Sequence, residues 1–186
     1  MEGALAMGKR GFSVLLCGFL FALPAFVQAA PARDDAVPTI ALWDSQDNAS
    51  PGLITERSDD PAAPDRIIED VRAPYLAVYV PERPNGTALL IAPGGGYARI
   101  VLDKEGTALV PAFVEAAAIT LFVLRYRLPD RMHAEGADAP LADAQRAMRL
   151  IRARASDYGI DPARVGVMGF SAGGHVAARL ATTVDA

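Results

Sequence analysis

The sequence predicts an α/β fold built on a doubly wound, mostly parallel sheet with helices on both faces. Apolar stretches at 88–92, 120–124 and 165–168 indicate strands that are covered on both sides. Stretches of helical length alternate with these strands, which is typical of a parallel sheet. Glycine-rich turns directly follow the first and the last strand, at 94–96 and 169–173. The 186 residues are enough for one such domain.

The first 29 residues are predicted to be a secretory signal peptide. Two basic residues precede an apolar run at 11–26, and residues of small or modest size predict cleavage after Ala29, with Ala32 as the second choice. An uncleaved membrane anchor is the alternative, but the run is near the lower limit for a spanning helix and Pro24 interrupts it. We therefore expect a secreted or periplasmic protein with no stable membrane insertion after cleavage.

The remaining chain divides into a leader and a domain. Residues 30–64 are rich in Pro, Asp, Ser and Ala, and they are predicted to form an extended leader that lies on the domain at 65–186. Trp43 in the leader either packs against the edge of the core or lines a sugar site. Cys17 is the only cysteine and lies in the signal, so the exported chain is expected to contain neither a disulfide nor a thiolate.

Local patterns define the other elements. Two shorter β patterns, at 66–71 and 75–80, precede the buried strands. Pro111 is expected to kink or split the first helix, because proline lacks the amide hydrogen that a helix interior needs. Gly159 is a suitable stop for the second helix. The helices are expected at 104–117, 140–158 and 171–182.

The turn at 169–173 matches the pattern G-x-S-x-G and has the form of a nucleophile elbow. In such an elbow a serine lies on a strained turn between a strand and a helix, and its neighbours are small because the backbones are crowded. The helix that begins there also directs its amide groups at the site. A purely structural glycine turn is the alternative, but the flanking strand and helix favour Ser171 as a nucleophile.

The glycines at 94–96 allow the backbone to turn its amides toward a ligand. Esterases and lipases place an H-G-G-G-type motif at this point to build part of an oxyanion hole, whose other amide comes from the residue after the nucleophile, here Ala172. The alternative is a plain flexible turn, which the elbow downstream disfavours. A phosphate site is not favoured, because neither G-K-[ST] nor G-x-G-x-x-G follows.

These motifs, in this order, resemble the α/β-hydrolase fold, and most closely the secreted esterases related to acetyl xylan esterases and to the hormone-sensitive-lipase-like group. The resemblance runs from Leu42 to Thr182 and depends mainly on "NGTALLIAPGGGYARIVLDKEG" and "PLADAQRAMRLIRARASDYGIDPARVGVMGFSAGGHVAARLAT". It implies a serine hydrolase that removes acetyl or other small acyl groups from carbohydrate such as xylan. The expected partner is therefore an acetylated carbohydrate or a small acyl ester, and neither a metal nor an organic cofactor is implied.

The resemblance also assigns roles to single residues. Tyr97 matches the aromatic residue that closes the glycine loop and can touch the substrate. Asp143 matches a recurrent acidic residue on the helix before the elbow, which we interpret as structural and not as the triad acid. The catalytic set that the resemblance implies is Ser171 as the nucleophile, with Gly95, Gly96 and Ala172 as the oxyanion-hole amides.

The acid and the base of the expected triad do not follow the elbow as they should. In this fold the chain order is Ser, then Asp or Glu, then His, yet Ser171 is followed only by His175 and Asp185. His175 is one helical turn away and points along the axis, so we interpret it as an anchoring residue, and His133 precedes the elbow. We therefore expect an incomplete domain, the N-terminal part of a longer enzyme, inactive alone, with strand 165–168 as an exposed apolar edge.

Two other functions stay open. One is a non-catalytic binding or partner module, whose open edge strand pairs with a second polypeptide. The other is a lipase-like or peptidase-like hydrolase on the same fold. A nucleic-acid partner is not expected, because the net charge is −4 and Lys and Arg do not cluster. No oligomeric state is predicted.

Overall fold

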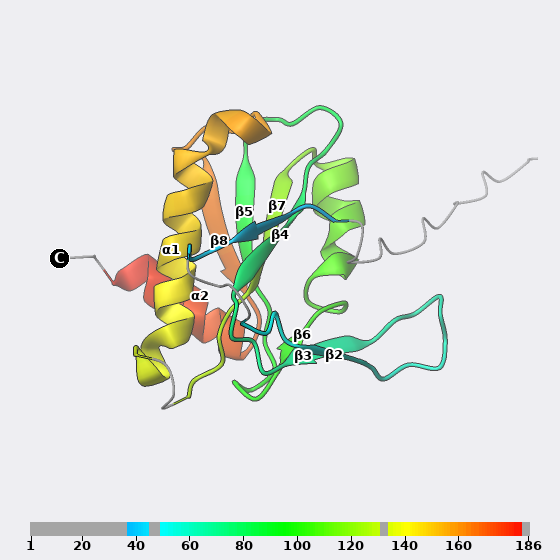
Figure 1. Ribbon diagram of the computed structural model, residues 1–186. Coiled ribbons are helices and arrows are strands. Elements are labelled where there is room, and N and C mark those ends of the chain that lie inside the picture. The colour runs from blue at the N-terminus through cyan, green and yellow to red at the C-terminus, as the bar shows by residue number, and fades with distance from the viewer. Residues whose placement is uncertain (1–36, 45–48, 131–133, 184–186) are drawn as a thin grey trace, which may run out of the picture.

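The computed structural model describes residues 37–44, 49–130 and 134–183. The predicted signal peptide at 1–29 lies outside these ranges, as do His133 and Asp185. The described residues form a main sheet of five strands with helices on both faces, and a smaller second sheet beside it (Figure 1). In this part of the chain, no helix has the length and apolar character needed to cross a membrane.

The main sheet is mixed, with a parallel part and an antiparallel part. The strand order is β1 (Thr39–Ala41), β4 (Tyr75–Tyr79), β7 (Thr120–Arg125), β5 (Ala88–Ala92) and β8 (Val165–Gly169). β7, β5 and β8 run parallel to one another, as the alternation of strands and helices predicts. β4 pairs with β7 in the antiparallel sense, and β1 pairs with β4 in the same way.

The parallel strands bring the two glycine-rich turns to the same edge of the sheet. Ala92 at the end of β5 is in register with Gly169 at the end of β8, so the turns leave the sheet side by side. β7 is buried along its whole length, as expected for a strand covered on both faces. β8 is the last strand of the sheet and is only half-buried, which agrees with the predicted exposed edge.

Helices cover the two faces of the main sheet and create two cores. α1 (Ala139–Ala153) and α2 (Ala172–Thr182) pack together on one face, where Phe122 and Leu124 of β7 join the larger core. Leu121 and Val123 point to the other face, where the helical segment Pro111–Ala116 covers a smaller core. This alternation follows from the two-residue period of a strand, and it confirms the doubly wound arrangement.

Proline and glycine set the ends of the helices. The predicted helix at 104–117 is not one α-helix but a 3-10 turn, Thr107–Leu109, followed by a short π-helix, Pro111–Ala116. The break lies at Pro111, as expected, because proline cannot continue an α-helix. α1 ends at Ala153 and a 3-10 turn follows it to Tyr158. Gly159 then adopts a left-handed conformation with φ of 61°, which confirms the predicted stop.

The leader at 30–64 contributes strands that the sequence did not predict. β1 forms the edge of the main sheet, and β2 (Leu53–Glu56) pairs with β3 (Arg66–Glu69). β3 in turn pairs with β6 (Ile100–Val101) to complete the second sheet. The described part of the leader is thus paired into both sheets rather than only lying on them. β1 and β2, which the sequence did not predict, have three and four residues, which is too short for a periodic pattern.

Candidate active site

Ser171 lies at a strained turn between β8 and α2, as the elbow predicts. Its backbone has φ of 48° and ψ of −117°, a conformation that costs a non-glycine residue about 1–3 kcal/mol. The side chain is exposed at the N-terminal end of α2. A Cβ on Gly169 would contact the carbonyl oxygen of Gly173, and one on Gly173 would contact that of Ala92. The elbow therefore needs glycine at both positions.

The glycine loop packs directly against this elbow. A Cβ on Gly94 would lie 2.5 Å from the carbonyl oxygen of Phe170 and 3.1 Å from Cβ of Ser171. Gly95 and Gly96 have φ of 137° and 65°, which places both in conformations that favour glycine. The structure thus brings the predicted oxyanion loop beside the predicted nucleophile.

Backbone hydrogen bonds fix the directions of the loop amides. The carbonyl oxygen of Gly94 accepts a bond of 2.9 Å from Val101 N–H, and that of Gly95 accepts bonds from Ala98 and Arg99 N–H. In a trans peptide the N–H of the next residue points opposite to the carbonyl. The N–H groups of Gly95 and Gly96 therefore point away from the protein groups that hold those carbonyls.

The three backbone donors predicted for the oxyanion hole have no acceptor within the described ranges. The N–H of Gly94 is occupied by Oε2 of Glu105 at 2.6 Å, so it cannot bind a ligand. The N–H groups of Gly95, Gly96 and Ala172 donate to no group that the structure describes. These are the amides that the sequence predicts for an oxyanion hole, and the N-terminal end of α2 adds its partial positive charge.

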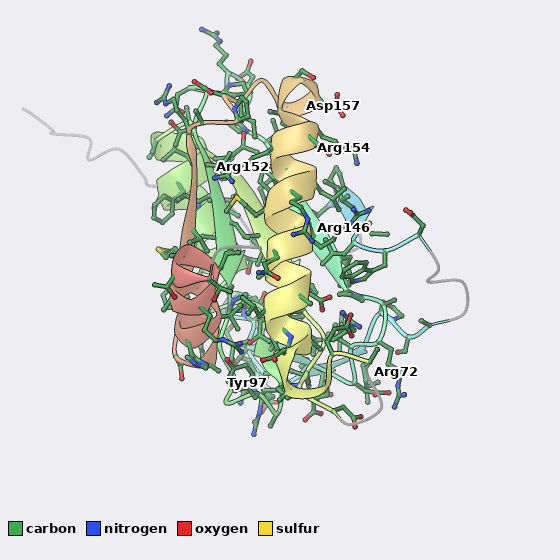
Figure 2. The ribbon with its side chains drawn as sticks, turned by 90° about the vertical axis from the view of Figure 1, so that its left-hand side faces the viewer. Arg72, Tyr97, Arg146, Arg152, Arg154 and Asp157 are labelled. Carbon is green, nitrogen blue, oxygen red and sulfur yellow. The ribbon has the colours of Figure 1, made fainter. Side chains whose placement is uncertain are left out.

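Tyr97 closes the loop and contacts α2. Its hydroxyl lies 2.8 Å from Nδ1 of His175, and the two rings meet edge to face. Burial raises the pKa of the Tyr97 phenol above its ordinary value, so the hydroxyl stays protonated at neutral pH. Figure 2 shows Tyr97 at the end of the molecule opposite Arg154 and Asp157. His175 is therefore engaged with the loop, in keeping with an anchoring residue.

Asp143 has a structural environment. It is fully buried, and Arg127 donates to both of its carboxylate oxygens, including a bond of 2.7 Å from the guanidinium. Trp43 Nε1 donates to it at 2.8 Å, and the indole ring lies under the guanidinium groups of Arg127 and Arg146. These contacts support the structural interpretation of Asp143. They also place Trp43 against the core edge, the first of its two predicted roles.

Glu105 is the site residue that sequence reasoning missed. It lies in the turn after β6, and its carboxylate reaches back to Gly94 at the start of the glycine loop. The neighbouring Asp103 is buried and holds Arg66 through an ion pair of 2.7 Å. Both acidic residues stand in the "DKEG" part of the stretch that carries the resemblance, which is the only signal the sequence offered.

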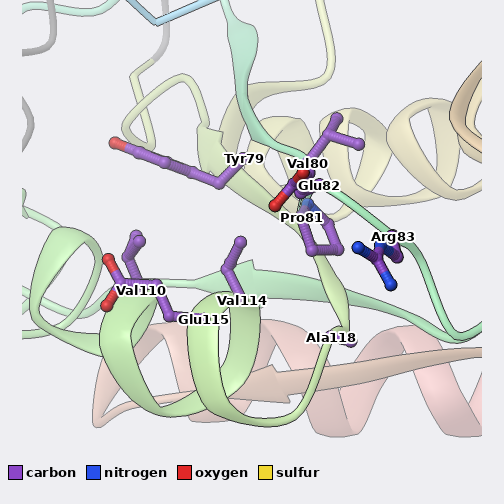
Figure 3. A pocket seen from close by; sticks show the side chains of 9 residues that line it. All are labelled: Tyr79, Val80, Pro81, Glu82, Arg83, Val110, Val114, Glu115 and Ala118. Atoms are coloured by element: carbon purple, nitrogen blue, oxygen red, sulfur yellow. The ribbon is translucent and has the colours of Figure 1, made fainter.

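One cavity among the described residues is remote from Ser171. It has a volume of about 580 Å³ and lies between the end of β4 and the helical segment Pro111–Ala116 (Figure 3). Tyr79 at the end of β4 is in register with Leu121 near the start of β7. The cavity therefore lies near the N-terminal ends of the parallel strands, whereas the elbow follows the C-terminal end of β8. It is lined by Tyr79, Val80, Pro81, Glu82, Arg83, Val110, Val114, Glu115 and Ala118.

The structure brings five predicted site residues together at the C-terminal ends of β5 and β8, and none of the other described residues forms an acid–base pair with Ser171 there. Ser171, Ala172, Gly95, Gly96 and Tyr97 come from the two turns that follow β8 and β5. Across the ranges that the structure describes, no three His, Cys, Asp or Glu side chains are grouped to hold a metal ion.

The known proteins to which this chain is similar include esterases and related hydrolases. The BD-FAE family model matches residues 76–186, more than half of the chain. An acetylxylan esterase from Xylanibacter ruminicola is 36% identical over 107 residues, which cover 58% of this chain and 21% of that protein. An acetyl ester-xyloside bifunctional hydrolase from Caldicellulosiruptor lactoaceticus is 34% identical with a TM-score of 0.53, covering 75% of this chain and 44% of that one.

A second solved structure identifies the fold. An α/β hydrolase enzyme from a Medee basin deep-sea metagenome library is 29% identical with a TM-score of 0.53, covering 71% of this chain and 52% of that one. The chain thus spans about half the length of the solved structures it matches, and less of the acetylxylan esterase. These similarities confirm the predicted α/β-hydrolase fold and the predicted resemblance to acetyl xylan esterases. The chain belongs to the BD-FAE family.

Proposed function

We propose that this chain carries the nucleophile and the oxyanion hole of a serine esterase that removes acetyl or other small acyl groups from carbohydrate such as xylan. The observation that supports this most is the position of Ser171 at a positive φ beside three amides that have no acceptor among the described residues. The similarity to an acetylxylan esterase supports the choice of an acetylated carbohydrate as the substrate.

The reaction follows from this arrangement. Oγ of Ser171 attacks the ester carbonyl and gives its proton to a base, while the N–H groups of Gly95, Gly96 and Ala172 stabilise the negative oxygen. The tetrahedral intermediate then expels the sugar alcohol, which takes the proton from the base. Water attacks the acyl-serine in the same manner, releases the acid and restores Ser171. Tyr97 stands at the edge of the loop, where it can contact the acyl group or the sugar.

We further propose that the base and its acid partner are supplied from outside these 186 residues. His175 shares the helix of Ser171, and its Nδ1 is already bonded to Tyr97. A serine hydroxyl is a poor nucleophile without a base. The 186-residue chain alone is therefore expected to have negligible turnover, and Ser171-dependent activity comparable to that of complete esterases would contradict this.

The protein is further proposed to be exported, with residues 1–29 removed as a signal peptide. The intact mass of the protein purified from the export fraction of its own host tests both proposals. A mass near that of residues 30–186 supports the cleavage site and argues against a base supplied within the same chain. A larger mass is expected if the chain carries the acid and the histidine itself.

The activity is tested on the protein as its own host exports it, with p-nitrophenyl acetate and acetylated xylan as substrates. Ser171→Ala is expected to lower kcat by about 10⁴-fold or more, as for loss of a catalytic serine. The matched control is Ser156→Ala, an exposed serine in the turn after α1, which is expected to leave kcat unchanged. Hydrolysis that survives in Ser171→Ala would overturn the proposal.

Substrate preference separates the esterase from its relatives on the same fold. Acetyl esters are expected to be hydrolysed faster than long-chain esters or peptide amides. A preference for long-chain esters would instead favour a lipase-like enzyme, and cleavage of peptide amides would favour a peptidase-like one. Each outcome still requires Ser171.

A partner module is the second candidate function, and the edge of the main sheet favours it. Among the described strands β8 pairs only with β5, so its outer edge is open, and Val165 and Val167 are half-buried. An open apolar edge is a template for another strand. Size-exclusion chromatography with light scattering distinguishes the two: a defined complex supports the module, while a monomer with Ser171-dependent activity removes it.

A further inference from the structure

We propose that Glu105 is a positioning residue that orients the oxyanion-hole amides of Gly95 and Gly96 by holding the peptide group that precedes them in the chain. The inference rests on the proposed esterase function, because it concerns the same site. It assigns to Glu105 a role that the motifs around Ser171 do not contain. Its basis is a set of hydrogen bonds around a single peptide unit, the one that joins Pro93 to Gly94.

This peptide unit is held at both of its polar ends. Its carbonyl, on Pro93, accepts a hydrogen bond of 2.8 Å from the hydroxyl of the buried Tyr126. Its N–H, on Gly94, donates to Oε2 of Glu105 at 2.6 Å. A peptide group is planar, so two bonds on opposite ends fix its rotation about the chain. A bond to a carboxylate is also stronger than one between neutral groups.

The orientation of this peptide unit influences the orientation of the next two N–H groups in the chain, those of Gly95 and Gly96. The next carbonyl, on Gly94, is held by Val101 of β6, and the one after it, on Gly95, is held by Ala98 and Arg99. Each fixed carbonyl leaves the opposite N–H, of Gly95 and then of Gly96, directed away from the protein groups that hold it. Without Glu105, the bond from Tyr126 is the one that would still hold the first unit among the described residues, and glycine has no side chain to limit its rotation.

Glu105 itself stands on a rigid turn. Asp103, two residues earlier, is buried and accepts hydrogen bonds from the guanidinium and backbone N–H of Arg66 and from the hydroxyl of Thr107. Gly106 allows close approach in the same turn, because a Cβ there would contact the carbonyl oxygen of Leu102. These hydrogen bonds hold the turn against β3, so the backbone of Glu105 is fixed in a position from which its side chain contacts Gly94.

Amide hydrogen exchange by NMR in the exported protein tests the positioning independently of activity. In Glu105→Ala, exchange at Gly94 is expected to accelerate about 10-fold or more, because a charge-assisted bond is lost. The amide shifts of Gly95 and Gly96 are expected to change with it, and Glu105→Gln, which keeps an acceptor, is expected to fall between. Glu115→Ala, an exposed glutamate at the remote cavity, is the matched control. Changes confined to Gly94, or none, would overturn the proposal.

Kinetics of the exported protein provide a second readout. Complete loss of one oxyanion donor costs about 10²–10³ in kcat, so misorientation in Glu105→Ala is expected to lower kcat by about 10- to 10²-fold. KM is expected to stay within about 3-fold, with partial recovery in Glu105→Gln, because these amides act mainly in the transition state. An unchanged kcat would contradict the proposal. If Ser171→Ala retains activity, the esterase function fails, while hydrogen exchange still decides the role of Glu105.

Discussion

The hydroxyl of Tyr97 lies 2.8 Å from Nδ1 of His175, with ring centroids 6.1 Å apart and an interplanar angle of 82°. This contact joins the glycine loop after β5 to the first turn of α2, so it connects the two halves of the proposed oxyanion hole. Tyr97 has a positive φ of 61°, which a non-glycine residue adopts only when its surroundings hold it there. His175 supplies part of that support.

A double-mutant cycle is expected to measure this coupling. Tyr97→Phe and His175→Ala each lose the bond, so the double variant should lose less unfolding free energy than the sum of the two, by about 0.5–1.5 kcal/mol. Urea denaturation of the four proteins measures it. Tyr97→Phe combined with Arg152→Ala, whose side chain lies far from Tyr97 in Figure 2, is expected to be additive. Additivity in the Tyr97–His175 pair would show that the contact carries no energy.

The two glycines after the nucleophile are expected to differ sharply in tolerance. A Cβ on Gly173 would lie 2.5 Å from the carbonyl oxygen of Pro93 and closer still to that of Ala92. Gly173→Ala should therefore lower the unfolding free energy by about 3 kcal/mol, a typical cost of forced overpacking. On Gly174 the nearest atom would be 3.3 Å away, and the helix propensity of Ala offsets that contact, so Gly174→Ala is expected to change stability by less than about 1 kcal/mol. Equal melting temperatures for the two variants would refute this reading.

Strain at Ser171 is expected to appear as a stability difference between two inactive variants. Ser171→Ala keeps a Cβ at φ of 48°, whereas Ser171→Gly removes it. The glycine variant should be more stable than the alanine variant by about 1 kcal/mol. Glycine removes a backbone strain of about 1–3 kcal/mol, but it also raises the conformational entropy of the unfolded chain, which offsets part of that gain. Chemical denaturation of both proteins is the measurement. A more stable alanine variant would mean that the turn stores no strain.

The buried carboxylate of Asp103 is expected to make stability depend on pH in acid. Burial by itself would raise the pKa of Asp103, but hydrogen bonds from Arg66 and Thr107 outweigh burial and lower the pKa overall. A carboxyl group with a lowered pKa adds stability above its ordinary pKa of about 4, and this is lost as the pH falls through the folded-state value. The unfolding free energy should therefore fall below about pH 4. Asp103→Asn should flatten that decline and lower stability at pH 7, while the exposed Glu115→Gln should do neither.

Much of the fold and the outline of the site could be predicted because their signals are local. Continuous apolar runs predicted β5, β7 and β8, and Gly159 predicted the stop after α1. The pattern around Ser171 predicted a strand–turn–helix junction, since only small neighbours fit there, and its positive φ confirms the turn. The catalytic roles of Ser171 and the loop amides, and the signal peptide at 1–29, stay predictions.

Other features depend on residues that are far apart in the sequence. β1 and β2 have three and four residues, which is too short for a periodic pattern to be recognised, and they become strands because β4 and β3 offer them edges. The bond between Tyr97 and His175 spans 78 positions, and no local pattern contains it. The sequence by itself determined the parallel strands β5, β7 and β8, the elbow and the small residues that crowding requires, because these depend on neighbours along the chain. Only the tertiary structure decided that Glu105 holds Gly94, because that hydrogen bond exists only once β6 and the turn after it have brought the carboxylate to the loop.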